Sequence, residues 1–277
     1  MRKRVPISGP RFPWPPAAHR PRRWVISDGV QGLLLFGFFL VAGCGPRVAP
    51  VLEEPPTSTV VTTAGPNNSM IHAARVEGGV IVIDLGWWGS DDALMQGLDE
   101  LGAGPEDVRA VFITHAHRDH LGAWELVGHA PFYMAEEEEP LFFGDDRPGG
   151  WIPRWADRIR GRHLPERGEV EVRTFASDTT IHVGEEPIRA FKVPGHTPGS
   201  TAYLFRETLF AGDAVAHSSL GGFQPARRGF SDDVTEARRS LAELRERLEG
   251  YPVRYICTAH AQCTELDDDF WDDALGG

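Results

Sequence analysis

Residues 114–122 read THAHRDHLG, and this short stretch restricts the fold more than any other part of the chain. It follows an apolar run, VRAVFIT at 108–114, which is typical of a strand buried on both faces of a sheet. Because alternate residues of an extended chain point the same way, His115 and His117 present both imidazoles on one side. The pattern predicts a metal site where this buried strand ends.

Asp119 and His120 complete the cluster as the chain turns away from the strand. A single ion cannot easily use four donor groups from so short a segment, whereas two adjacent ions can share them. Imidazole and carboxylate groups together suit zinc, and they also suit iron or manganese. Two zinc ions are therefore the expected cofactors, with iron or manganese as alternatives.

Three later segments each place a further donor group at the end of a predicted strand. VPGHTPGST presents His196, LFAGDAV presents Asp213, and ICTAH presents His260. Strand ends are where a framework of strands and helices places its sites, so we expect these side chains to join the first cluster.

Periodicity predicts the remaining elements. Val234, Ala237, Leu241, Leu244 and Leu248 form one apolar stripe, which predicts a helix over 231–249. A second helix is expected over 91–101, with Ser90 as its N-terminal cap. The predicted strands cover 69–76, 80–84, 108–114, 130–135, 170–175, 180–183, 187–193, 201–205, 208–211 and 253–260. Two stacked sheets with helices outside are expected from this pattern.

Two parts of the chain allow more than one interpretation. Residues 144–168 are expected to form an irregular insertion, in which Trp151 and Trp155 either cap a pocket or pin a long loop to the body. His217 either lines that pocket or faces water. The sequence does not choose between these alternatives.

In order, H-x-H-x-D-H, G-H-T-P-G, G-D and a late strand-end histidine resemble the motif set of the metallo-β-lactamase-fold hydrolases. The resemblance covers roughly Asn67 to His260, and it is specific for the fold rather than for the substrate. It implies an α+β protein, a four-layer αββα sandwich with its metals at one edge of the sheets.

The resemblance also implies roles for individual residues. Asp84, which closes VIVID, is implied to orient a ligand histidine. The implied mechanism is attack of a metal-bridging hydroxide on a carbonyl carbon, with Asp119 or a metal-bound water handling the proton. The implied ligands are His115, His117 and His196 for one metal, Asp119, His120 and His260 for the other, and Asp213 as the bridge.

The implied substrate is a small ester, lactone, thioester or amide. Only seventeen residues follow His260, so the C-terminal substrate region of glyoxalase II is not expected. Ala216 stands three residues after Asp213, where many homoserine-lactone-cleaving relatives have tyrosine. The alternatives are a periplasmic β-lactamase and a persulfide dioxygenase with a single iron.

The N-terminal region resembles a bacterial lipoprotein signal. A basic stretch precedes the apolar run GVQGLLLFGFFLVAG, and the run ends in LVAGC. This pattern predicts a signal peptide over 1–43, lipidation of Cys44, a tether over 44–66 that includes the strand-like TVVTT, and a hydrolase domain over 67–277. The protein is then expected to be exported and anchored by lipid to a bacterial membrane, facing the periplasm or the exterior. A short transmembrane anchor is the alternative.

Charge and cysteines limit the partners. Residues 1–43 hold 7 of the 28 basic and 1 of the 40 acidic residues, so removing them leaves 21 against 39 and a formal charge of −18. Because such a body repels phosphates, we expect a small-molecule substrate and no nucleic acid. Cys257 and Cys263 form either a disulfide or two separate thiols, and neither the pairing nor the oligomeric state follows from the sequence.

Overall fold

The computed structural model describes residues 58–62, 69–160, 163–218, 222–261 and 263–276. The predicted signal peptide, Cys44 and most of the predicted tether lie outside these residues. Within the described residues, no helix is both long enough and apolar enough to cross a membrane.

The first sheet follows the order of the chain, β1-β2-β3-β4-β5-β6. The neighbours β1–β2 and β2–β3 are antiparallel, and β3 to β6 run parallel. The predicted entering strand is present as β1 and pairs with β2. The bounds are β1 Ser58–Thr62, β2 Met70–Val76, β3 Gly79–Ile83, β4 Val108–Phe112, β5 Phe132–Ala135 and β6 Val172–Phe175.

The second sheet has the order β14-β13-β10-β9-β8-β7. Its β10 and β13 run parallel, and its other neighbours are antiparallel. A separate hairpin pairs β11 with β12. The bounds are β7 Thr179–Val183, β8 Glu186–Lys192, β9 Thr201–Phe205, β10 Thr208–Gly212, β11 Val215–Ser218, β12 Gly222–Pro225, β13 Tyr255–Thr258 and β14 Thr264–Glu265.

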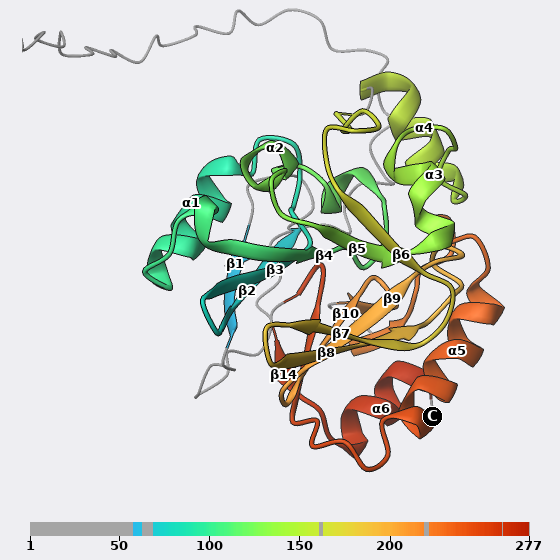
Figure 1. The fold of residues 1–277 in the computed structure, drawn as a ribbon. Helices are drawn as coiled ribbons and strands as arrows, with labels where there is room; N and C mark the ends of the chain where they lie inside the picture. Colours follow the sequence, from blue (N-terminus) through green and yellow to red (C-terminus); the bar gives the residue numbers. More distant parts are fainter. Residues whose placement is uncertain (1–57, 63–68, 161–162, 219–221, 262, 277) are drawn as a thin grey trace, which may run out of the picture. The chain divides into compact units, whose positions relative to one another are not determined.

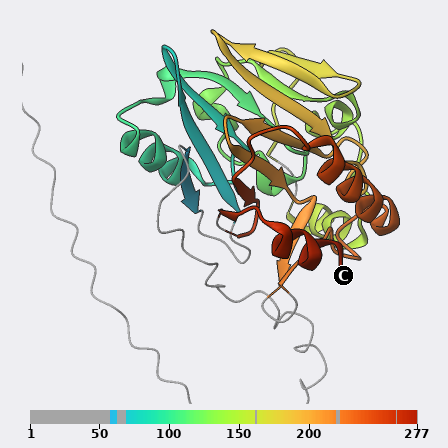
Figure 2. The same ribbon diagram turned by 90° about the horizontal axis from the view of Figure 1, so that it is seen from below.

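Helices cover the outer face of each sheet. Figure 1 shows α1 and α2 above the first sheet and α5 and α6 below the second, and Figure 2 views the molecule from the side of α5 and α6. The order of layers is helix, sheet, sheet, helix, which confirms the predicted αββα sandwich. The helix bounds are α1 Asp91–Glu100, α2 Trp124–Val127, α3 Glu139–Phe142, α4 Trp151–Arg160, α5 Val234–Arg247 and α6 Asp268–Leu275.

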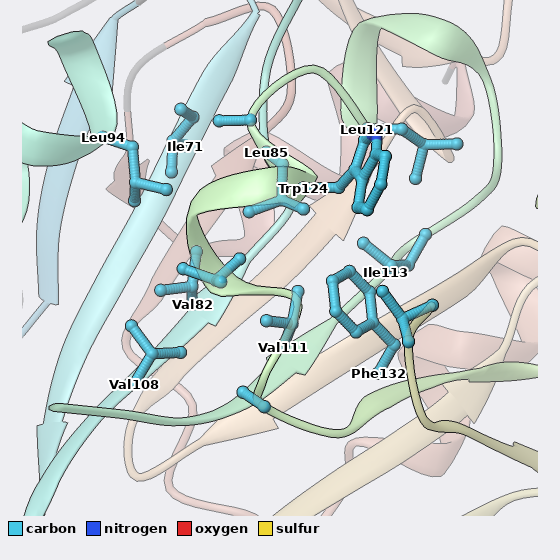
Figure 3. Close-up of a cluster of buried hydrophobic side chains, with 14 of the residues drawn as sticks. Ile71, Val82, Leu85, Leu94, Val108, Val111, Ile113, Leu121, Trp124 and Phe132 are labelled. Atoms are coloured by element: carbon cyan, nitrogen blue, oxygen red, sulfur yellow. The ribbon is translucent and has the colours of Figure 1, made fainter. Parts of the chain in front are cut away.

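Strand alternation builds the interfaces between these layers. On β3, Val80 and Val82 face the helical layer of α1 and α2, while Ile81 and Ile83 face the second sheet. Figure 3 shows Val82 and Val111 in the outer cluster with Leu94 of α1 and Trp124 of α2. Because β3 and β4 are buried on both faces, their ends are held rigidly, and the metal-site segments begin at those ends.

Three local predictions need correction. The segment 144–168 is not irregular throughout, because its middle forms α4. Ser90 stands at the N-cap of α1, but its hydroxyl bonds the carbonyl of Trp87 rather than capping the helix. The helix predicted over 231–249 begins only at Val234, because Asp233 caps α5, where its Oδ1 accepts from the amides of Thr235 and Glu236 at 2.8 and 3.0 Å.

Candidate metal centre

The segments that carry the predicted ligands are tied together by backbone hydrogen bonds at one edge of the two sheets. The amide of Thr201 donates to the carbonyl of Thr114 at 2.9 Å, which joins the His196 turn to the end of β4. The amide of Ala259 donates to Gly212 at 3.1 Å, which joins the end of β13 to the end of β10. The fold therefore brings residues far apart in sequence to one place.

Three buried histidines form the first group. Nε2 of His115, Nδ1 of His117 and Nε2 of His196 lie 3.0–3.1 Å from one another. Tetrahedral zinc with bonds of about 2.05 Å spaces its nitrogens about 3.3 Å apart, so this triangle is close to the size that one ion needs.

Hydrogen bonds at the far side of the rings select which nitrogen faces this group. Thr114 Oγ1 donates to Asp84, so it accepts from Nδ1 of His115 at 3.2 Å. Ser231 Oγ donates to the carbonyl of Arg227, so it accepts from Nδ1 of His196 at 3.1 Å. In both rings the Nε2 lone pair is left to face the other histidines, as a metal ligand requires.

Asp119, His120 and His260 form the second group, with donor atoms within 4.8 Å of one another. Asp119 Oδ2 lies 3.5 Å from His260 Nε2. The Nε2 of His120 is buried and has no hydrogen-bond partner among the described residues. A buried ring nitrogen without a partner is costly, and a cation at this position would satisfy it.

Asp213 lies between the two groups. Its Oδ2 is 3.4 Å from Nε2 of His196, while its Oδ1 is 3.3 Å from Nε2 of His260 and 4.0 Å from Nε2 of His120. One carboxylate thus offers an oxygen to each group. The donor set of imidazoles and carboxylates fits a pair of cations such as zinc.

Asp84 holds His120 in place. Its Oδ2 accepts from Nδ1 of His120 at 2.9 Å, and its Oδ1 accepts from the amide of Thr114 at 2.8 Å. Asp84 has a φ of 57°, a left-handed conformation that aspartate tolerates better than most residues. The carboxylate fixes the ring so that Nε2 faces the second group.

Burial and neighbouring charges set the protonation of the cluster. Burial, with His120 and His196 nearby, holds the pKa of His115 well below its usual value, so this ring is neutral. Burial opposes ionisation of Asp213, yet His260 and His196 hold its pKa well below the usual range. Burial also opposes the charge on His120, but Asp84 above all raises its pKa to about 9, so a cation bound there displaces a proton.

Glu138 supports the site and was missed by the sequence analysis. Its Oε2 accepts from the amide of Ala116 at 2.7 Å, and its Oε1 accepts from Thr197 Oγ1 at 2.6 Å and from the amide of Gly199 at 2.9 Å. This buried carboxylate therefore joins the loop of His115 and His117 to the loop of His196. The run of glutamates at 136–139 looks like a solvated surface, and only its place directly after β5 could have indicated this role.

The predicted pocket residues lie on two different elements. Trp151 and Trp155 are 69% and 62% exposed on α4, and Arg118 Nη1 donates to the carbonyl of Ala156 at 3.3 Å, so α4 adjoins the ligand segment. His217 lies on β11 with its ring 4.9 Å from that of Phe223. These contacts place α4 beside the candidate metal centre and His217 in the β11–β12 hairpin.

The fold and the histidine-rich edge together define the class of metal-dependent hydrolases with an αββα sandwich. The sequence model of the metallo-β-lactamase superfamily matches residues 62–260. The chain therefore belongs to the metallo-β-lactamase superfamily and is a metallo-hydrolase.

Named relatives and solved structures agree with this assignment. A probable polyketide biosynthesis zinc-dependent hydrolase, BaeB from Bacillus velezensis, is 28% identical over 67% of this chain and 72% of its own. A hydroxyacylglutathione hydrolase from Shewanella loihica is 28% identical over 69% of this chain, which spans 62% of that enzyme's length. The BLEG-1 B3 metallo-β-lactamase superposes with a TM-score of 0.59 at 22% identity, over 79% of this chain and 100% of that one.

Proposed function

We propose that the protein is a dinuclear zinc hydrolase that cleaves a small ester, lactone, thioester or amide. The observation that carries this proposal is the position of Asp213, whose two oxygens face two separate groups of ligands. Cations held by these groups supply Lewis acidity and lower the pKa of coordinated water toward neutrality.

Two residues of the second group, Asp119 and His260, are more accessible than the histidines of the first, whereas His120 is buried. The side chains of Asp119 and His260 are 17% and 30% exposed, whereas the first three histidines are almost fully buried. Substrate is therefore proposed to approach from the side of Asp119. This carboxylate is the residue that we propose to accept and return the proton during hydrolysis.

The relatives favour hydrolysis over oxidation. The two relatives described above are both named as hydrolases, one of them zinc-dependent and the other acting on hydroxyacylglutathione. The β-lactamases among the solved structures are similar in fold alone at this level of identity. A thioester is accordingly the first choice within the proposed range.

A substrate panel tests the proposal. We expect the purified protein to contain two zinc ions per chain and to hydrolyse at least one of a set of lactones, thioesters, esters and β-lactams. Chelation should abolish turnover and added zinc should restore it, because the imidazoles and carboxylates of the cluster are not themselves electrophiles and depend on a bound cation for Lewis acidity. Elemental analysis measures the metal, and initial rates measure turnover.

Other results of this experiment would decide against the proposal. A single iron per chain, with oxidation of glutathione persulfide, would identify a dioxygenase of the same fold. Full activity in a sample without metal would show that the ligand cluster has no role in turnover.

We also propose that the protein is exported and anchored to a bacterial membrane by lipid on Cys44, after removal of residues 1–43. The LVAGC sequence after an apolar run supports this proposal. In a bacterial host, Cys44→Ser is expected to block both lipid labelling and processing of the precursor. Normal labelling of this variant with radioactive palmitate would contradict it.

A further inference from the structure

A disulfide closes the loop that presents His260. Cys257 and Cys263 are paired, and His260 lies midway between them. In the β13–β14 hairpin, Ile256 pairs with Thr264, so the two cysteines are the next pair toward the loop. The bond therefore closes a ring of seven residues with the metal-site histidine at its far end.

Each side of this loop has its own restraint. Before His260, Ala259 donates its amide to Gly212 at 3.1 Å and accepts from the amide of Met70 at 2.8 Å. After His260, the chain is held at Cys263 by the disulfide. The covalent bond thus fixes the returning side relative to β13.

The disulfide lies in the packed core between the sheets, where there is little room for movement. Cys257 and Cys263 are buried with Phe210 and Tyr203. Alanine at both positions leaves a gap where the two sulfurs stood, whereas two free thiols would have to separate from about 2.05 Å to about 3.5–4 Å. In either case the close-packed core around the loop has to rearrange, and the loop loses its covalent restraint.

The neighbouring His72 does not make the two cysteines a metal site. Its Nδ1 is buried and has no hydrogen-bond partner among the described residues, and one of its ring nitrogens lies within 4.8 Å of both sulfurs. A metal at that position would need thiolates, and the disulfide leaves none. The pair therefore acts through its covalent bond.

We propose that the Cys257–Cys263 disulfide is a positioning element for the second metal, because it fixes His260 against Asp119 and Asp213. His260 Nε2 lies 3.5 Å from Asp119 Oδ2 and 3.3 Å from Asp213 Oδ1. A displacement of about 1 Å is enough to impair a metal site. The three histidines of the first group lie on other segments, so loss of the disulfide should leave the first zinc bound. This inference rests on the proposed dinuclear site.

The test uses the double variant Cys257→Ala/Cys263→Ala and, as a milder change, Cys257→Ser/Cys263→Ser. We expect the Kd of the second zinc to rise about 10–100-fold, as when a group that orients a metal ligand is removed. The first zinc should stay bound. Competition titration with a chromophoric chelator measures both constants, and the visible spectrum of the cobalt-substituted protein reports the second site independently of activity.

Two further variants separate positioning from general loss of stability. Val183→Ala removes packing from the same core on β7, and it should leave both zinc constants unchanged. In a His260→Ala background, removing the disulfide should cause no additional loss of the second zinc, because the two changes act through one contact.

The outcomes distinguish this inference from the proposed function. Wild-type protein with two zinc ions, and disulfide variants with unchanged constants and cobalt spectrum, would overturn the inference and leave the dinuclear site intact. Wild-type protein that never binds a second zinc would refute the dinuclear proposal itself. Equal weakening of both zinc sites would also overturn the inference.

Discussion

Replacing His117 by alanine should remove the ion of the first group and lower kcat/KM by about 10³-fold or more. The reason is that Lewis-acid stabilisation is worth several kcal/mol, and each 1.4 kcal/mol is about a factor of ten in rate. His117 contributes one corner of the nitrogen triangle with His115 and His196. The two remaining nitrogens and the shared Asp213 carboxylate would hold zinc much less tightly than the full set.

The comparison with Asp119→Ala makes this prediction specific. Asp119 belongs to the second group, so its loss should leave the first zinc bound and reduce the metal content from two to one per chain. The exposed His129→Ala is a matched control and should change neither metal content nor rate. Elemental analysis and initial rates give the measurements. Full activity and metal content in His117→Ala would show that the ligand assignment is wrong.

Replacing Glu138 by alanine should lower the free energy of unfolding by about 3 kcal/mol or more. Three donors, from Ala116, Thr197 and Gly199, lose their acceptor inside the protein, and each buried unsatisfied group costs about 1–3 kcal/mol. For a domain of this size the corresponding fall in Tm is about 6–12 °C. Thermal and urea unfolding measure the effect.

Glu138→Gln gives a finer test of the same contact. Glutamine keeps the volume and one acceptor, but its amide would place a donor against one of the three donors. We expect a smaller loss of stability than for alanine, together with weaker zinc binding, since two ligand loops lose a shared anchor. The exposed neighbour Glu136→Gln should have no effect. A Glu138→Ala variant as stable as the unchanged protein would refute the proposed role.

Local signals explain why much of the fold could be predicted. The apolar run before His115 and the regular leucine stripe of α5 depend on burial patterns that a short window of sequence displays. The candidate ligands were predicted for a related reason, because a cluster of histidines and aspartates at the ends of buried strands is typical of a metal site. The role of Asp84 was implied by the resemblance to the metallo-β-lactamase-fold hydrolases.

The missed features depend on long-range contacts or on ambiguous local signals. Glu138 looks like its exposed neighbours until β5 is placed beside the 196–199 turn. α4 follows Gly149 and Gly150 and contains Pro153, which normally indicates a loop; here the proline falls in the first helical turn, where no amide hydrogen bond is required. The pairing of Cys257 with Cys263 became evident only when the β13–β14 register was known.

The placement of α4 has a consequence for how such a protein can diversify. The ligands stand at the ends of buried strands, whereas the exposed tryptophans stand on a connecting helix that touches the ligand segment through Arg118. Substitutions on the outer surface of that helix leave the strands undisturbed. A new substrate preference could therefore arise there by gradual change, with the metal-holding residues left as they are.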